Sequence, residues 1–256
     1  MESTGEYPRV EYLTYRISHG PGWDYLPAAT ADGQLGRFDY RIAEKRATFR
    51  PRVRIESEHQ AREELAPLLA AWELAATLAR GADRIRFVFE HCHVRREPPR
   101  PGVVELSGLA VTAMFGDVTV VVQSNEYDKP SSELGWSEMV ATLRDRYESM
   151  LRGESLHHHG NAMLTRVERE YGNRAGAATA LQIEYSVLKA LGEVLANRGS
   201  PDEVRKFSKD FTGAPLTEAE KEWMRAVLRA ILERAARRCA GTLGPAVLTM
   251  ADLPPR

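Results

Sequence analysis

Near the middle of this chain the hydrophobic pattern takes a helical period and does not change back. Up to residue 124, apolar side chains in many segments alternate with polar ones, which is typical of β-strands. After a loop at 125–135 they recur every three or four residues, which is typical of amphipathic helices. The change predicts an α+β fold in two parts, a strand-rich α+β domain at 1–130 and an all-helical domain at 131–256.

The first part is predicted to form an antiparallel sheet of about six strands packed on one long helix at 58–80. The strands are expected at 8–18, 37–42, 49–55, 84–94, 103–115 and 118–124, with a Gly/Pro-rich loop at 19–36. Two short turns favour antiparallel pairing, one near Glu44 and Lys45 and one at Gly116 and Asp117. Pro51 has no N–H to donate, so it predicts that its strand lies at an edge of the sheet.

The second part is predicted to be a bundle of four or five helices. They are expected at 140–151, 156–171, 174–196 and 201–209, followed by one long helix that begins after 217. Thr217 and Glu220 have the spacing of a capping box, in which each side chain satisfies a backbone N–H of the other residue. This spacing predicts the start of the last helix.

Five arginines of the first hairpin are predicted to share one face of the sheet, because strand alternation places them opposite the apolar side chains. They are Arg37, Arg41, Arg50, Arg52 and Arg54, with Asp39 as the only acid among them. Guanidinium groups bind phosphates and carboxylates through paired hydrogen bonds, so this face is a candidate anion-binding surface for RNA or an acidic protein. The alternative is a solvated face whose arginines pair with acidic residues from loops or from the helical half.

Two histidines end one of the predicted strands. His91 and His93 are two residues apart, so they share a face, whereas Cys92 points to the opposite face. With Glu105 from a neighbouring strand they would supply three ligands for a divalent metal. The alternative is a pair of partly buried polar side chains.

A second group of histidines follows an arginine in the helical half. Four residues separate Arg152 from His157, and His158 and His159 come next. This spacing resembles the Arg-x(4–6)-His element of the HEPN superfamily, small helical-bundle domains that often act as RNA-cleaving toxins or defence proteins. The resemblance implies a ribonuclease with Arg152, His157 and His159 in the active site, usually completed across a dimer. In that family the element lies within a helix, whereas Gly153 here favours a helix end.

The segments 173–192 and 251–255 resemble the C-terminal region of uncharacterised bacterial proteins, and this resemblance implies no activity.

For Arg152 and the three histidines, the alternative to a ribonuclease site is a solvated helix start.

Charge and composition limit the classes of function. The 35 Lys and Arg residues and 36 Asp and Glu residues are evenly spread, which argues against a protein that binds nucleic acid by neutralising many phosphates at once. We expect a cytoplasmic protein without a membrane span, because the acidic start has no secretion signal and no apolar run approaches about 18 residues. The two cysteines, Cys92 and Cys239, fit a reducing compartment.

Three functions follow from these residues. The first is a non-catalytic binding or adaptor protein that recognises an anionic ligand or a protein partner, with no cofactor and with helices available for a homodimer. The second is a HEPN-like ribonuclease, and the third is a metal-dependent enzyme. The binding protein ranks first because it needs no distant residues to converge.

Overall fold

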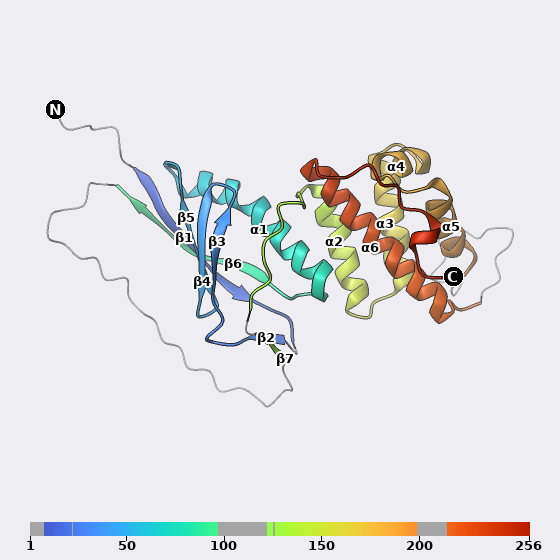
Figure 1. Ribbon diagram of the computed structural model, residues 1–256, viewed down its shortest axis with the longest axis horizontal. Helices are drawn as coiled ribbons and strands as arrows, with labels where there is room; N and C mark the ends of the chain where they lie inside the picture. Colours follow the sequence, from blue (N-terminus) through green and yellow to red (C-terminus); the bar gives the residue numbers. More distant parts are fainter. Residues whose placement is uncertain (1–7, 22, 97–121, 125, 199–213) are drawn as a thin grey trace. The chain divides into compact units, whose positions relative to one another are not determined.

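The computed structural model describes residues 8–21, 23–96, 122–124, 126–198 and 214–256 and has an α+β fold (Figure 1). The chain divides into two compact units. Unit 1 holds Met1–Leu69 and Arg84–Asp128, and unit 2 holds Ala70–Asp83 and Lys129–Arg256. The long helix α1 (Glu58–Arg80) therefore begins in unit 1 and ends in unit 2.

Unit 1 contains a five-stranded antiparallel sheet in the order β3-β4-β5-β1-β6. Its strands are β1 (Arg9–Ser18), β3 (Ala31–Leu35), β4 (Phe38–Ala43), β5 (Arg46–Pro51) and β6 (Arg86–Arg95). Glu44 and Lys45 join β4 to β5 with φ angles of 52° and 59°, in the left-handed region that a tight hairpin turn requires. The structure thus confirms the antiparallel α+β fold and the position of this hairpin.

Two expectations about the strands are wrong. β5 is not an edge strand, because it pairs with both β4 and β1; Pro51 is its last residue, where a missing N–H interrupts no later ladder. The Gly/Pro-rich loop contains β3 and also β2 (Trp23–Tyr25), which pairs in parallel with β7 (Val122–Ser124). Most of the strands expected at 103–124, including Glu105, and the helix expected at 201–209 lie outside the described residues.

The two faces of the five-stranded sheet differ in the side chains they carry. On one face Leu13, Ile42 and Phe49 are fully buried, together with Leu65 from the first half of α1. The other face carries polar and aromatic side chains from the alternate positions of the same strands. This outer face contains most of the side chains that the sequence singled out in the first half.

Unit 2 is a bundle around one apolar core, which includes Leu74 from the end of α1 and Trp223 from the last helix. Its own helices are α2 (Glu138–Leu151), α3 (Leu156–Glu170), α4 (Arg174–Leu181), α5 (Tyr185–Asn197), α6 (Glu218–Ala240) and the short 3-10 helix η1 (Met250–Asp252) (Figure 1). The capping box of Thr217 and Glu220 is present at the start of α6.

The helix expected at 174–196 is two helices. Gln182 ends α4 with a φ of 52°, and its carbonyl accepts a hydrogen bond from Leu248 N at 2.9 Å. Arg234 of α6 donates to the carbonyls of Leu181 and Gln182 at 3.2 and 3.1 Å. These contacts from the C-terminal region satisfy carbonyls that a continuous helix would use internally, which explains the break.

Candidate functional site

An arginine-lined depression lies on unit 1 where β5 ends. After Pro51 the chain bends at residues 52–53 and then lies beside β1 again, where Val10 N donates to Ile55 O at 2.7 Å. The depression has a volume of about 560 Å³, and its lining includes Arg9, Tyr12, Arg50, Arg52 and Arg54. The depression therefore contains three of the five predicted hairpin arginines, together with Arg9 from β1.

The charges around the depression leave it positive. Glu11, the only acid in its lining, is 2.6 Å from Arg95 Nε, outside the depression, and 3.8 Å from Arg9 Nη2, inside it, so one of its two arginine partners is not part of the lining. Arg52 contacts Asp39 at 3.8 Å and Arg54 contacts Glu56 at 3.0 Å, both as exposed pairs. The exposed side chain of Arg50, opposite Asp39 in the ladder, makes no ion pair or hydrogen bond within the described part of the chain.

Tyr12 connects the depression to the two predicted metal ligands. It stacks on His93 with ring centroids 5.2 Å apart and meets His91 edge-on at 5.9 Å. Because β1 lies between β5 and β6, Tyr12 stands between these histidines and Arg50. Aromatic rings and guanidinium groups thus adjoin on one solvent-facing surface, which we name the Tyr12 surface and define as Tyr12, His91, His93 and the arginine-lined depression.

The remaining two hairpin arginines lie elsewhere. Arg37, in the turn before β4, is 2.5 Å from Glu64 of α1. Arg41 lies opposite Asp32 of β3 and lines a different, smaller pocket. The Arg37 and Arg41 side chains therefore do not line the depression that holds Arg50, Arg52 and Arg54.

His91 and His93 face away from Cys92, as strand alternation predicts. Cys92 pairs with Leu13 on the buried side of the sheet, where burial raises the pKa of its thiol to about 11. His93 is hydrogen-bonded to Glu11 at 3.1 Å. Within the described residues no group of three or more His, Cys, Asp or Glu side chains is arranged to hold a metal ion, and Glu105 lies outside them.

Arg152 and the histidines of the HEPN-like spacing belong to different helices. Arg152 caps the end of α2, Gly153 follows with a φ of 93°, and His157 lies in the first turn of α3. The guanidinium of Arg152 binds Asp83 through Nε at 2.7 Å and Nη2 at 2.8 Å. In the described part of the chain no hydrogen bond joins it to His157 or His159.

A solvated helix start, the alternative to a ribonuclease site, would expose all three histidines, but two of them are buried. His157 and His159 are each 3% exposed, whereas His158 is on the surface. His159 Nε2 lies 3.0 Å from Glu154 Oε2, and neither ring nitrogen of His157 has a hydrogen-bond partner among the described residues.

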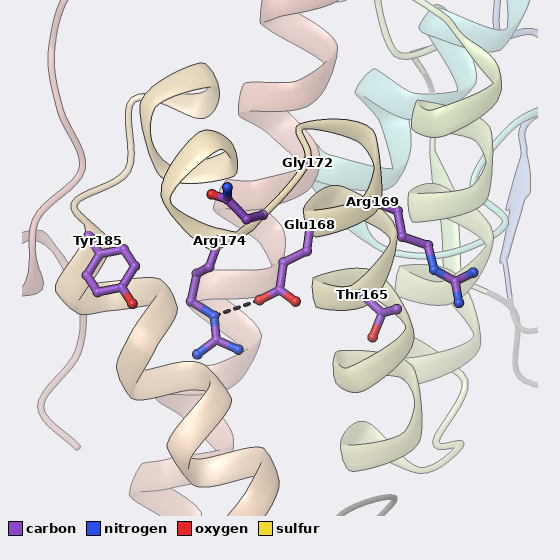
Figure 2. Close-up of a pocket in the computed structure, with 7 residues that line it drawn as sticks. Thr165, Glu168, Arg169, Gly172, Arg174 and Tyr185 are labelled. Atoms are coloured by element: carbon purple, nitrogen blue, oxygen red, sulfur yellow. Dashed lines mark hydrogen bonds and ion pairs between the residues drawn. The ribbon is translucent and has the colours of Figure 1, made fainter.

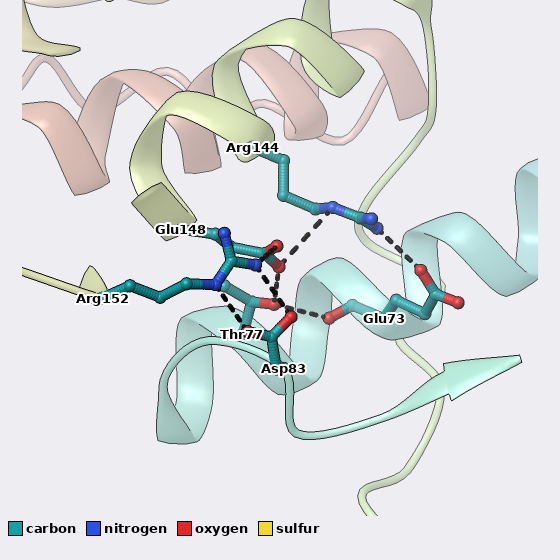
Figure 3. A network of polar contacts seen from close by, with 6 residues as sticks. All are labelled: Glu73, Thr77, Asp83, Arg144, Glu148 and Arg152. Carbon is teal, nitrogen blue, oxygen red and sulfur yellow. Dashed lines mark hydrogen bonds and ion pairs between the residues drawn. The ribbon is translucent and has the colours of Figure 1, made fainter. Parts of the chain in front are cut away.

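Arg152 is part of a polar network that fastens α2 to the end of α1 (Figure 3). At its centre Glu148 is 1% exposed and accepts a hydrogen bond from Thr77 Oγ1 at 2.7 Å. Arg144 lies 3.6 Å from Glu148 and donates to Glu73 at 2.9 Å. These contacts give Arg152 and its neighbours a structural role in unit 2.

Sequence reasoning missed Arg9 and Tyr12. Both precede the hairpin, and only the pairing of β1 with β5 brings them beside Arg50. Strand alternation was the available signal, since it places Tyr12 on the face opposite Leu13.

None of the described helices is long and apolar enough to cross a membrane. Comparison of the chain with protein-family models, with curated proteins and with solved structures finds no match.

Proposed function

We propose that this protein binds single-stranded RNA, without catalysis, through the Tyr12 surface. The observation that carries the proposal is the arginine-lined depression beside Tyr12. Proteins bind single strands by combining a positive groove, which follows the phosphates, with aromatic rings on which bases stack. The depression supplies the charge and Tyr12 supplies a ring next to it.

The chemistry of the arginines and of Tyr12 favours RNA over an acidic protein as the ligand. The Arg50 side chain makes no ion pair or hydrogen bond within the described residues, so its guanidinium needs to break no ion pair to bind a phosphate. A carboxylate-rich partner would use the arginines but would gain little from Tyr12 or His91. The ribonuclease and the metal enzyme have no comparable supporting contact in the described part of the chain.

The proposal is tested by fluorescence anisotropy with a labelled single-stranded RNA at several salt concentrations. Contacts from four arginines predict a slope of about −2.8 in log affinity against log salt, since each phosphate contact on a single strand contributes about −0.7. Changing Arg50→Glu and Arg52→Glu together should flatten the slope by about 1.4 and weaken binding at least about tenfold. Thermal stability should change little, because exposed charges contribute only about 0–1 kcal/mol each.

One further variant distinguishes RNA from other polyanions, and a second serves as its control. Tyr12→Leu should weaken RNA binding by about fivefold or more, since stacking contributes about 1–3 kcal/mol per base, and should leave binding to heparin or polyglutamate unchanged. Arg41→Glu is the matched control, an exposed arginine of the same hairpin outside the depression. The proposal would be refuted if Arg41→Glu lost as much RNA affinity as the double variant, or if polyglutamate bound as tightly as RNA. Unfolding of the double variant would also refute it.

A further inference from the structure

Unit 2 contains an open cleft at the junction of α3, α4 and α5 (Figure 2). Its volume is about 480 Å³, within the range of small-molecule sites. The polar lining consists of Thr165, Glu168, Arg169, Asn173, Arg174 and Tyr185. None of these residues belongs to the Tyr12 surface or to the network around Glu148.

Arg174 is held in a fixed orientation in this cleft. Asn173 caps α4 by accepting a hydrogen bond from Gly176 N at 2.8 Å, which places Arg174 at the first position of the helix. Its Nε donates to Glu168 Oε1 at 2.6 Å. In Figure 2 its two Nη atoms point away from Glu168. Neither Nη atom has a hydrogen-bond partner among the described residues.

Gly192 of α5 provides the space for this guanidinium. A Cβ atom at that position would lie 2.5 Å from Nη1 and 2.7 Å from Nη2 of Arg174, closer than atoms in contact allow. The guanidinium therefore lies against bare helix backbone. A cation that is oriented before its ligand arrives loses less side-chain entropy on binding.

The rest of the cleft adds charge and a flat ring. Glu168 and Arg174 neutralise each other, so the exposed Arg169, which has no ion pair in the described part of the chain, leaves a net positive charge. Tyr185 is 50% exposed and lies on the side of Arg174 opposite Glu168 (Figure 2). Exposed tyrosine rings stack well on flat ligands.

We infer that this cleft binds a small ligand in which a carboxylate or phosphate group is joined to a flat ring. The oxyanion binds the two Nη atoms of Arg174, and the ring packs on Tyr185. Arg169 supplies long-range attraction, and Thr165 supplies a hydroxyl donor. This ligand site is independent of the proposed RNA binding.

The experiment measures binding of adenosine monophosphate and of benzoate to the full chain by NMR titration. Each complete ligand is compared with its own half-ligands, adenosine and inorganic phosphate for adenosine monophosphate, and benzyl alcohol and acetate for benzoate. We expect one of the two complete ligands to bind at least about tenfold more tightly than both of its half-ligands, because two contacts act together. Which of them binds distinguishes a nucleoside phosphate from an aromatic acid.

Three variants assign the binding to Arg174. Arg174→Gln should weaken it at least about tenfold, as expected for a lost charge-assisted pair of hydrogen bonds. Gly192→Ala should weaken it similarly by displacing the guanidinium, while the alanine favours the helix and so protects the fold. Arg225→Gln, on the exposed side of α6, should bind as the natural chain does. The inference is overturned if neither complete ligand binds better than the half-ligands, or if Arg174→Gln leaves the affinity unchanged.

Discussion

Glu220 is a buried carboxylate at the start of α6 with two different partners. Its Oε2 accepts from Thr217 N at 2.9 Å, and its Oε1 accepts from Arg198 Nε at 3.0 Å. Burial by itself raises the pKa of this carboxyl, but the hydrogen bonds from Thr217 and the charge of Arg198 outweigh burial and lower the pKa below 4.5. The ionised form therefore stabilises the folded state.

The lowered pKa predicts how stability depends on pH. The contribution of Glu220 is fully present above the ordinary carboxyl pKa of 4.5 and is lost as the pH falls through the lower value of the folded state. Glu220→Gln keeps an oxygen that can accept from Thr217 N but removes the negative charge beside Arg198 and the helix start, so it should reduce the free energy of unfolding at neutral pH by about 1 kcal/mol. Urea denaturation should show this difference shrinking below about pH 4.5. Glu222→Gln, an exposed change on the same helix, should show no such effect, and a difference independent of pH would contradict this account.

At the scale of elements, one buried charge, that of Glu148, lies where α2 meets the end of α1. Glu148 contacts Thr77, Arg144 and Arg152 (Figure 3). A carboxylate that is 1% exposed is tolerated because these partners compensate its lost hydration. Removing it leaves Arg144, whose side chain is 11% exposed, without one of its two acidic neighbours.

The second prediction follows from this network. Glu148→Leu should reduce the free energy of unfolding by about 3 kcal/mol, because one partner of a buried pair is lost while the other stays buried. Asp145→Ala, on the exposed side of the same helix, should change it by less than about 0.5 kcal/mol. Guanidinium denaturation followed by circular dichroism at 222 nm measures both. A small effect of Glu148→Leu would show that the network contributes little to the fold.

At the scale of the whole molecule, the helical unit is not confined to the second half of the sequence. Residues 70–83 belong to it, and Leu74 is fully buried in its core. The change of hydrophobic period near 125–135 marks where strands stop, but it does not mark where the helical core begins.

Because residues 70–83 belong to the helical unit, the structure predicts how fragments of the chain behave. A chain of residues 131–256 alone should expose the surface that Leu74 covers and leave Glu148 without Thr77, so it should bind the dye ANS and melt at a lower temperature. Adding residues 70–83 through a flexible Gly/Ser linker should restore a cooperative transition and reduce dye binding. If both fragments melt alike, the end of α1 is not needed by the helical unit.

The features that the sequence predicts correctly depend on neighbours in the chain. Alternation identifies β1, β4 and only the first half of the strand expected at 49–55, since β5 is Arg46–Pro51, and the two residues at 44–45 form the hairpin turn. The spacing of Thr217 and Glu220 identifies the start of α6. Each of these is decided by backbone geometry over a few residues, so it can be inferred without knowing the tertiary fold.

The candidate sites depend on residues far apart in the sequence. The pairing of β1 with β5 brings Tyr12 beside Arg50, and helix packing lays Arg174 against Gly192. Arg152 has the expected spacing to His157 but is directed to Asp83, because a helix ends between them. Periodicity by itself determined which face each side chain occupies within its own element. Which of those faces meet was decided by the register of the strands and the packing of the helices, because both are set by burial of the whole core.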